Sequence, residues 1–282
     1  MKFVFTVLFM ANLIVSAQVY SPKIYGHRGC RGMLPENSIE GFQQAINLGA
    51  DGIEFDVVVN KDKQIVISHA PYMEQKYCLM PDGGRIKQEK EFNLFQMTQI
   101  EIEQFDCGSK YHPNFPEQKK LKTHKPLLQE LFDKIDFSEI MLLFEIKSEK
   151  RYYGKYQPQP DEYIDIILKE VSNYVHKKNI IFMSFDANII NELHKRAPQY
   201  KLVYLTYAPF KSVKSSIKDL TIQPYAIGMY NPTISKKEIK KAHELGIAVF
   251  AWTVNSYKDF ERLKRYEIDG IITDYPGAFI KR

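Results

Sequence analysis

The sequence lacks several features that define broad classes of protein. Its one long apolar run, residues 3–15, is shorter than the roughly 20 residues that a membrane-spanning helix needs. It has no internal repeat and no low-complexity segment. The formal charge of +5 is too small and too dispersed to predict a nucleic-acid partner. With 282 residues, 44% of them hydrophobic and 26% charged, the chain has the composition of a globular protein with a sizeable core.

The N-terminus predicts export. Lys2 precedes the apolar run, and Val15, Ser16 and Ala17 place small residues where a signal peptidase cleaves. A membrane anchor is the alternative, which the length of the run disfavours. We therefore expect a signal peptide at residues 1–17 and a mature chain at 18–282, periplasmic or secreted, without a transmembrane segment.

Cysteine is scarce, with only Cys30, Cys78 and Cys107. Export compartments permit disulfides, and an odd number leaves one thiol unpaired. Because Cys78 and Cys107 share a loop-rich stretch with little core of its own, we predict that these two pair. The alternative is three free thiols.

Short β-branched or aromatic runs recur along the chain, with helical patterns between most of them. They are residues 23–27, 52–59, 140–147, 179–185, 201–207, 226–230, 248–254 and 270–274. Helix starts are indicated by Asn37 with Glu40, Ser235 with Glu238, and Ser256 with Asp259, and helix ends by Gly49 and Gly246. The alternation predicts an α/β fold, a (β/α)8 TIM barrel with its active site at the carboxyl ends of the strands. A doubly wound open sheet is the alternative, but "GHRGCRG" does not have the glycine spacing of a dinucleotide-binding turn.

Two segments interrupt the alternation after the second strand. The turn "NKDKQ" leads into residues 65–70, which we expect to form a hairpin arm above the barrel rim.

Residues 71–126 then form a loop-rich insertion, and a loop of this length is usually functional. Its aromatic residues are expected mostly to form a small core, and alternatively to seat a quaternary ammonium group. They are Tyr72, Tyr77, Phe92, Phe95, Phe105 and Tyr111.

Three carboxylates lie on two of the predicted strands. Side chains two apart share a face of a strand, so Glu54 lies beside Asp56, and Glu145 lies beside Lys147. Carboxylates on strands are costly to bury unless they are paired or bind a metal. The set predicts an oxygen-ligand site suited to Mg²⁺ or Ca²⁺ rather than Zn²⁺. An exposed edge strand is the alternative for Glu54 and Asp56, and the "VVV" that follows disfavours it.

Further polar and aromatic side chains are expected at the same rim. His27 ends the first strand and His69 ends the hairpin arm, so two imidazoles can flank a metal-bound ligand. Arg28 follows His27 directly, and an imidazole next to a guanidinium group can bind an anion. Trp252, at the end of the seventh strand, is the best candidate for a ring that faces the substrate.

Six motifs in order resemble the glycerophosphodiester phosphodiesterase family. They are "HRG" at 27–29, "PENS" at 35–38, "GADGIEFDV" at 49–57, "VISHAP" at 66–71, "FEIK" at 144–147 and "DGIITDYP" at 269–276. The resemblance implies a TIM barrel with an inserted segment and a divalent metal, Mg²⁺ or Ca²⁺. It also implies hydrolysis of glycerophosphodiesters to an alcohol and glycerol 3-phosphate. Carried over by motif, Glu54, Asp56 and Glu145 hold the metal, His27 and His69 are the acid and base, and Arg28 and Lys147 contact phosphate. Glu36 is expected to order the loop beneath His27.

The chain departs from the family pattern after the second histidine. Ala70 replaces the usual aspartate, and the usual arginine is not evident in "PYMEQKYC". The preferred alcohol group therefore stays open, as do the choice of ion, the route by cyclic phosphate or direct water attack, and the oligomeric state. The alternatives are an enzyme like phosphatidylinositol-specific phospholipase C or sphingomyelinase D, or a secreted noncatalytic lipid- or phosphate-binding barrel. The noncatalytic alternative is disfavoured because all three carboxylates and both histidines are present.

Overall fold

The computed structural model describes residues 20–174, 176–207 and 212–280, and the predicted signal peptide lies outside them. Among these residues, eight parallel strands close into a barrel, because β1 pairs with both β2 and β9. The strands are β1 (Lys23–His27), β2 (Gly52–Val59), β4 (Met141–Ile146), β5 (Ile180–Ser184), β6 (Lys201–Thr206), β7 (Ala226–Tyr230), β8 (Ala248–Trp252) and β9 (Gly270–Thr273). The predicted TIM barrel is confirmed, and every predicted strand is present to within two residues.

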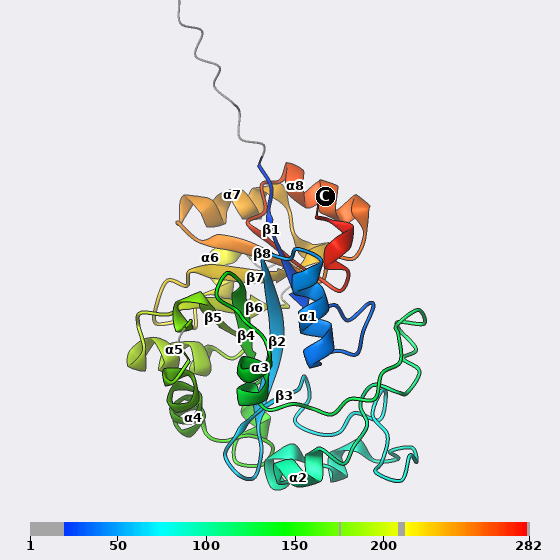
Figure 1. The fold of residues 1–282 in the computed structure, drawn as a ribbon. Helices are drawn as coiled ribbons and strands as arrows, with labels where there is room; N and C mark the ends of the chain where they lie inside the picture. Colours follow the sequence, from blue (N-terminus) through cyan, green and yellow to red (C-terminus); the bar gives the residue numbers. More distant parts are fainter. Residues whose placement is uncertain (1–19, 175, 208–211, 281–282) are drawn as a thin grey trace, which may run out of the picture.

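Helices surround the barrel (Figure 1). They are α1 (Ile39–Asn47), α3 (Leu128–Lys134), α4 (Pro160–Ser172), α5 (Ala187–Arg196), α6 (Val213–Ser216), α7 (Lys236–Glu244) and α8 (Tyr257–Arg265). Short 3₁₀ turns lie at Glu89–Glu91, Leu94–Gln96, Lys150–Tyr152, Lys177–Asn179, Asn231–Thr233 and Pro276–Ala278. Among the described residues, no helix is long and apolar enough to cross a membrane.

The predicted helix starts at Ser235 and Ser256 are confirmed, since each side chain accepts a hydrogen bond from the backbone N–H three residues later. The predicted start at Asn37 is wrong by one residue. Ser38 caps α1 instead, and Asn37 lies before the helix at a positive φ of 55°. Asparagine tolerates this left-handed conformation better than most residues do.

Alternation along the strands separates two cores. One face of each strand packs against the helices, as Phe55 and Phe144 do in the largest cluster of buried residues. The other face fills the barrel, where Tyr25, Leu143 and Phe250 belong to a separate cluster. Residues two positions further along these strands therefore point to the same interior, at its carboxyl end.

The hairpin arm and the insertion form a separate layer at this end. Strand β3 (Ile65–Ile67) pairs antiparallel with β2, which confirms the hairpin. The insertion, which includes α2 (Gln99–Ile102), lies near β3 in Figure 1. Its small core is confirmed around Tyr77 and Phe105, and the Cys78–Cys107 disulfide joins that core as predicted. Phe95 packs on the barrel core instead, and Tyr111 is 53% exposed.

Candidate active site

Glu54, Asp56 and Glu145 converge inside the carboxyl end of the barrel. Asp56 on β2 lies in register with Glu145 on β4, and each of the three offers an oxygen within 4.8 Å of the others. Glu54 and Asp56 are 1% exposed and Glu145 is 7% exposed. Oε1 of Glu54 and Oδ1 of Asp56 have no hydrogen-bond partner in the part of the chain that the structure describes. A cluster of buried, partly unsatisfied carboxylate oxygens fits a hard divalent cation.

The pKa values of these carboxyl groups reflect their crowding. Burial raises the pKa of Glu54, and the charges of Asp56 and Glu145 raise it further. Burial also raises the pKa of Glu145, against the opposing effect of Lys147. The pKa of Asp56 is lowered because Arg28 and Lys147 together outweigh its burial. A divalent cation would compete with protons for this set, since it stabilises the same oxygens in their charged form.

Arg28 follows β1 in a tight turn. It adopts a positive φ of 49°, and Gly29 one of 84°. A Cβ on Gly26 would lie 2.2 Å from the carbonyl oxygen of Gly29, so only glycine fits there. The backbone N–H of Arg28 donates to Oε2 of Glu54 at 2.9 Å, and its Nε lies 3.2 Å from Oδ2 of Asp56. The turn thus places a guanidinium directly beside the carboxylate cluster.

Lys147 supplies the second cation at the end of β4. Its Nζ is 2.5 Å from Oε1 of Glu145 and 3.5 Å from Oδ1 of Asp56. Burial would lower the pKa of Lys147, but these two carboxylates outweigh burial and raise it. Lys147 is therefore charged at neutral pH.

Asp274 holds His27 in place. Nδ1 of His27 lies 2.7 Å from Oδ1 of Asp274, and Nε2 lies 3.8 Å from Oε2 of Glu54. Burial lowers the pKa of His27 to about 4, helped by Arg31 and opposed by Asp274. The ring is therefore neutral at pH 7, with Nδ1–H donated to Asp274 and the Nε2 lone pair free.

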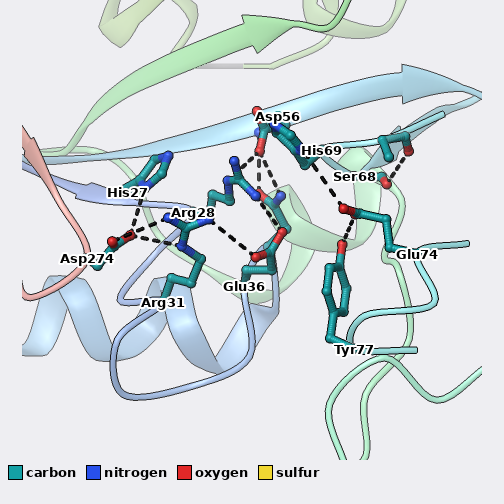
Figure 2. A network of polar contacts seen from close by, with 12 residues as sticks. His27, Arg28, Arg31, Glu36, Asp56, Ser68, His69, Glu74, Tyr77 and Asp274 are labelled. Atoms are coloured by element: carbon teal, nitrogen blue, oxygen red, sulfur yellow. Dashed lines mark hydrogen bonds and ion pairs between the residues drawn. The ribbon is translucent and has the colours of Figure 1, made fainter. Parts of the chain in front are cut away.

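His69 lies two residues beyond β3, on the opposite side of Arg28 and Glu36 from His27 (Figure 2). Its side chain is about a third exposed, and Nδ1 is 4.0 Å from Oε1 of Glu74. Its partial burial and the charges of Arg28 and Lys147 lower the pKa of His69, although Asp56 and Glu36 oppose this. The structure thus brings both predicted imidazoles to the carboxylate cluster.

Four polar residues of the site were missed by the sequence analysis: Arg31, Asn37, Glu74 and Asp274. Asp274 follows β9, which lies beside β1 in the barrel, and Arg31 also donates to it at 2.9 Å. Asn37 donates to Oδ2 of Asp56 at 2.9 Å. The position of Asp274 at the end of the last predicted strand was the available signal, because all strand ends of a barrel meet at one rim.

Glu36 orders the turn, as expected. It accepts a hydrogen bond from Nη1 of Arg28 at 2.6 Å, and a second oxygen lies 3.5 Å from Nη1 of Arg31. Burial favours its neutral form, but these two guanidinium groups prevail and lower the pKa of Glu36 to about 2. Glu36 therefore stays charged and links the two arginines.

These side chains line a continuous cleft. A cavity of ≈ 380 Å³ and a side cavity of ≈ 220 Å³ share His69, Glu145, Lys147 and Phe185. The larger one is lined by all the predicted site residues except Asp56, namely His27, Arg28, Glu54, His69, Glu145, Lys147 and Trp252. Trp252 packs edge-on against Phe185, which also lines the cleft, and at a tilt against Tyr230, at ring distances of 5.4 and 5.3 Å.

Fold and site together define a TIM-barrel protein with a cleft of charged side chains at the carboxyl ends of its strands, where the enzymes of this fold have their active sites. The model of the glycerophosphoryl diester phosphodiesterase family matches residues 27–278. The chain therefore belongs to this family and is a phosphodiesterase, as the sequence motifs predicted.

Relatives of similar length support this conclusion. A glycerophosphodiester phosphodiesterase of Caldanaerobacter subterraneus subsp. tengcongensis is 28% identical over 257 residues, which cover 91% of this chain and 96% of the relative. A solved structure from Silicibacter pomeroyi, provisionally named as a glycerophosphoryl diester phosphodiesterase, has a TM-score of 0.83 at 29% identity and 91% coverage of both chains. A phosphodiesterase of Oleispira antarctica, solved with the product sn-glycerol-3-phosphate, shares the fold with a TM-score of 0.74 at 19% identity, covering 92% of this chain and 95% of that one.

Proposed function

We propose that this enzyme hydrolyses small glycerophosphodiesters to an alcohol and glycerol 3-phosphate, with Mg²⁺ or Ca²⁺ held by Glu54, Asp56 and Glu145. The observation that carries the proposal is the buried carboxylate cluster, flanked by two imidazoles, with two oxygens that have no hydrogen-bond partner among the described residues. The product in the Oleispira antarctica structure supports the substrate class. Glycerophosphodiester is also the substrate in the name of the Caldanaerobacter relative.

Arg28 and Lys147 bind the phosphodiester anion. A phosphodiester repels nucleophiles, so its nonbridging oxygens must be neutralised before attack. Both cations line the cleft and are held beside the carboxylates. A divalent cation held by Glu54, Asp56 and Glu145 would supply further positive charge for the phosphate oxygens.

His27 and His69 transfer the protons. One imidazole, in its neutral form, accepts a proton from the nucleophile, and the other, which must first be protonated, transfers its proton to the departing alkoxide. The hydrogen bond from Nδ1–H to Asp274 leaves Nε2 of His27 as the atom that exchanges a proton. The nucleophile is either the neighbouring hydroxyl of glycerol, which yields a cyclic phosphate that water opens, or water itself. Both routes use the same residues.

Trp252 and the insertion contact the organic part of the substrate. Trp252 lines the larger cavity, and Pro71 of the insertion lines the side cavity. The aromatic ring of Trp252 suits packing against carbon atoms, and a cationic headgroup could gain about 0.5 to 2 kcal/mol from it.

We also propose that the chain is exported, with residues 1–17 removed. The Cys78–Cys107 disulfide supports this, because disulfides persist in oxidising compartments. Export would place the enzyme where it meets glycerophosphodiesters outside the cytoplasm.

A substrate panel tests the proposed activity. Purified mature chain is incubated with the choline, ethanolamine, inositol and glycerol diesters of glycerol 3-phosphate, each with Mg²⁺, with Ca²⁺ and with chelator. Glycerol 3-phosphate should form with metal and not with chelator, and His27→Ala should reduce turnover by about 10² or more. Binding of the diesters without turnover would instead support the noncatalytic barrel, and release of phosphocholine would contradict the proposed bond cleavage.

A further inference from the structure

The two imidazoles of the cleft are supported unequally. Asp274 holds Nδ1 of His27 at hydrogen-bond distance, 2.7 Å. The corresponding nitrogen of His69 faces Glu74, whose Oε1 lies 4.0 Å away. A proton-transfer histidine needs a fixed tautomer and ring orientation, so the surroundings of Glu74 matter.

Glu74 is itself firmly held. Tyr77 donates its hydroxyl hydrogen to Oε2 of Glu74, and Nζ of Lys125 lies 4.0 Å from the same oxygen. With Oε2 occupied in this way, Oε1 is left on the side of His69, as Figure 2 shows. Burial raises the pKa of Glu74, while the charge of Lys125 opposes that rise.

Lys125 links Ser68 to Tyr77, which lie on either side of His69 in the chain. Its side chain is only 4% exposed, and a lysine buried to that extent requires partners. Nζ donates to Oγ of Ser68 at 2.8 Å and to the hydroxyl of Tyr77 at 3.2 Å. Ser68 immediately precedes His69, so a single ammonium group fixes the chain on both sides of the imidazole.

The backbone beyond Glu74 is also constrained. The N–H groups of Tyr77 and Cys78 donate to the carbonyl oxygen of Glu74 at 3.3 and 3.0 Å. Cys78 is linked to Cys107 within the core of the insertion. The carboxylate is therefore anchored, and the partly exposed ring of His69 is the group with room to move.

We propose that Glu74, held by Tyr77 and Lys125, is the positioning residue for His69. A ring shift of about 1 Å brings Nδ1–H within hydrogen-bond distance of Oε1, and such contacts commonly tighten when substrate binds. The bond fixes the Nδ1–H tautomer and directs Nε2 into the cleft. This inference rests on the proposed function, in which His69 transfers a proton, and it gives one residue of the insertion, Glu74, a role in positioning that imidazole.

A double-mutant cycle tests the inference. Glu74→Gln keeps the shape of the side chain and an acceptor for Tyr77, and should lower kcat by about tenfold or more with KM changed less than twofold. In a His69→Ala background the same substitution should have no further effect on kcat. Glu91→Gln, which removes an exposed charge from the same insertion, is the matched control and should leave kcat unchanged. An equal loss of kcat in both backgrounds would show that Glu74 acts independently of His69 and would overturn the proposal.

A spectroscopic measurement tests the contact without relying on turnover. The ring nitrogens of His69 are observed by ¹⁵N NMR of histidine-labelled protein and assigned by their loss in His69→Ala. Glu74→Gln should shift the Nδ1 and Nε2 signals of His69, because the proposed bond selects one tautomer, while the signals of His243 should stay unchanged. Identical His69 signals in both proteins would overturn the inference. An inactive wild type that still shows the shift would refute only the proposed function.

A second variant covers the case in which Glu74→Gln does not fold. Tyr77→Phe keeps the carboxylate and removes the hydroxyl that holds it. It should lower kcat, again only when His69 is present, and should shift the His69 signals. If neither effect appears in folded Tyr77→Phe protein, the contact between Tyr77 and Glu74 does not position His69.

Discussion

At the scale of single residues, the strongest partner of an imidazole in the cleft is Asp274. Its carboxylate accepts hydrogen bonds from His27 and Arg31. Burial favours the neutral form of Asp274, but its interactions with His27 and Arg31 have the larger effect and lower its pKa. An aspartate that stays charged holds the ring and stabilises the imidazolium that forms when Nε2 takes a proton.

Asp274→Asn should therefore reduce kcat by about 10² or more, because the amide no longer selects the Nδ1–H tautomer and loses the charge. Steady-state kinetics on the best diester of the panel measures the effect. Asp269→Asn is the matched control, since Asp269 accepts from His243 at 2.8 Å outside the cleft. A kcat for Asp274→Asn within twofold of the wild type would contradict this role.

At the scale of secondary-structure elements, helix α4 contacts β3 through the partly buried carboxyl group of Glu170. Oε2 of Glu170 accepts from the backbone N–H of Ile65 at 3.3 Å. Burial raises the pKa of Glu170 from 4.5 to about 7, although this hydrogen bond opposes the rise. The folded protein thus holds a proton on Glu170 at pH values where the unfolded chain has released it.

The free energy of unfolding should fall as pH rises from about 4.5 to 7, since the folded state binds more protons than the unfolded state in this window. Glu170→Gln should remove this part of the pH dependence, so its stability should decline less between pH 5 and pH 8. Urea unfolding at both pH values measures the difference. Glu162→Gln, on the same helix and exposed, should keep the slope of the wild type, and a Glu170→Gln protein with that same slope would disprove the assignment.

The disulfide is the second link at this scale, because it closes a loop with a sequence separation of 29 in a segment with a small core. Cys78→Ser with Cys107→Ser should lower the free energy of unfolding by about 3 to 4 kcal/mol, the usual effect of opening a loop of this length. Denaturant melts of the two proteins measure this loss. Thiol counting on unreduced, denatured wild type should find only Cys30, and three reactive thiols would refute the pairing.

At the scale of the whole molecule, the barrel gathers three carboxylates at the centre of its carboxyl end. Two cations partly balance them, yet buried oxygens of Glu54 and Asp56 are still without hydrogen bonds among the described residues. This part of the folded state should therefore gain stability from any ion that binds there.

Mg²⁺ or Ca²⁺ should raise the melting temperature of the mature chain, and chelator should reverse the increase. An ion at 100 times its Kd adds about 2.7 kcal/mol to the free energy of unfolding. Glu54→Gln, Asp56→Asn and Glu145→Gln should each weaken binding measured by calorimetry and reduce the thermal shift, whereas Glu91→Gln should match the wild type. Unchanged metal binding in all three variants would exclude this cluster as the metal site.

Local patterns in the sequence were sufficient to predict much of the fold and site. The two-residue period of strands predicted that Glu54 and Asp56 share a face of β2. The position of His27 at the end of the first strand predicted that it lies at the same rim. The predicted helix start at Asn37 was wrong because this side chain donates a hydrogen bond to Asp56, 19 residues away, and does not cap the helix that follows it. Cap preference is a local rule, and it fails where a tertiary contact competes.

The sequence by itself determined the strand order, the hairpin, the carboxylate set and the two histidines, because each depends on spacing within one element or on the common rim of a barrel. Only the tertiary structure decided what holds the histidines. Asp274 reaches His27 across 247 residues because the last strand closes onto the first, and Glu74 faces His69 because Lys125 fixes an irregular loop. The end of a predicted strand can place Asp274 at the rim, but its partner there is set by chain closure, and contacts made by loops have no periodic signal.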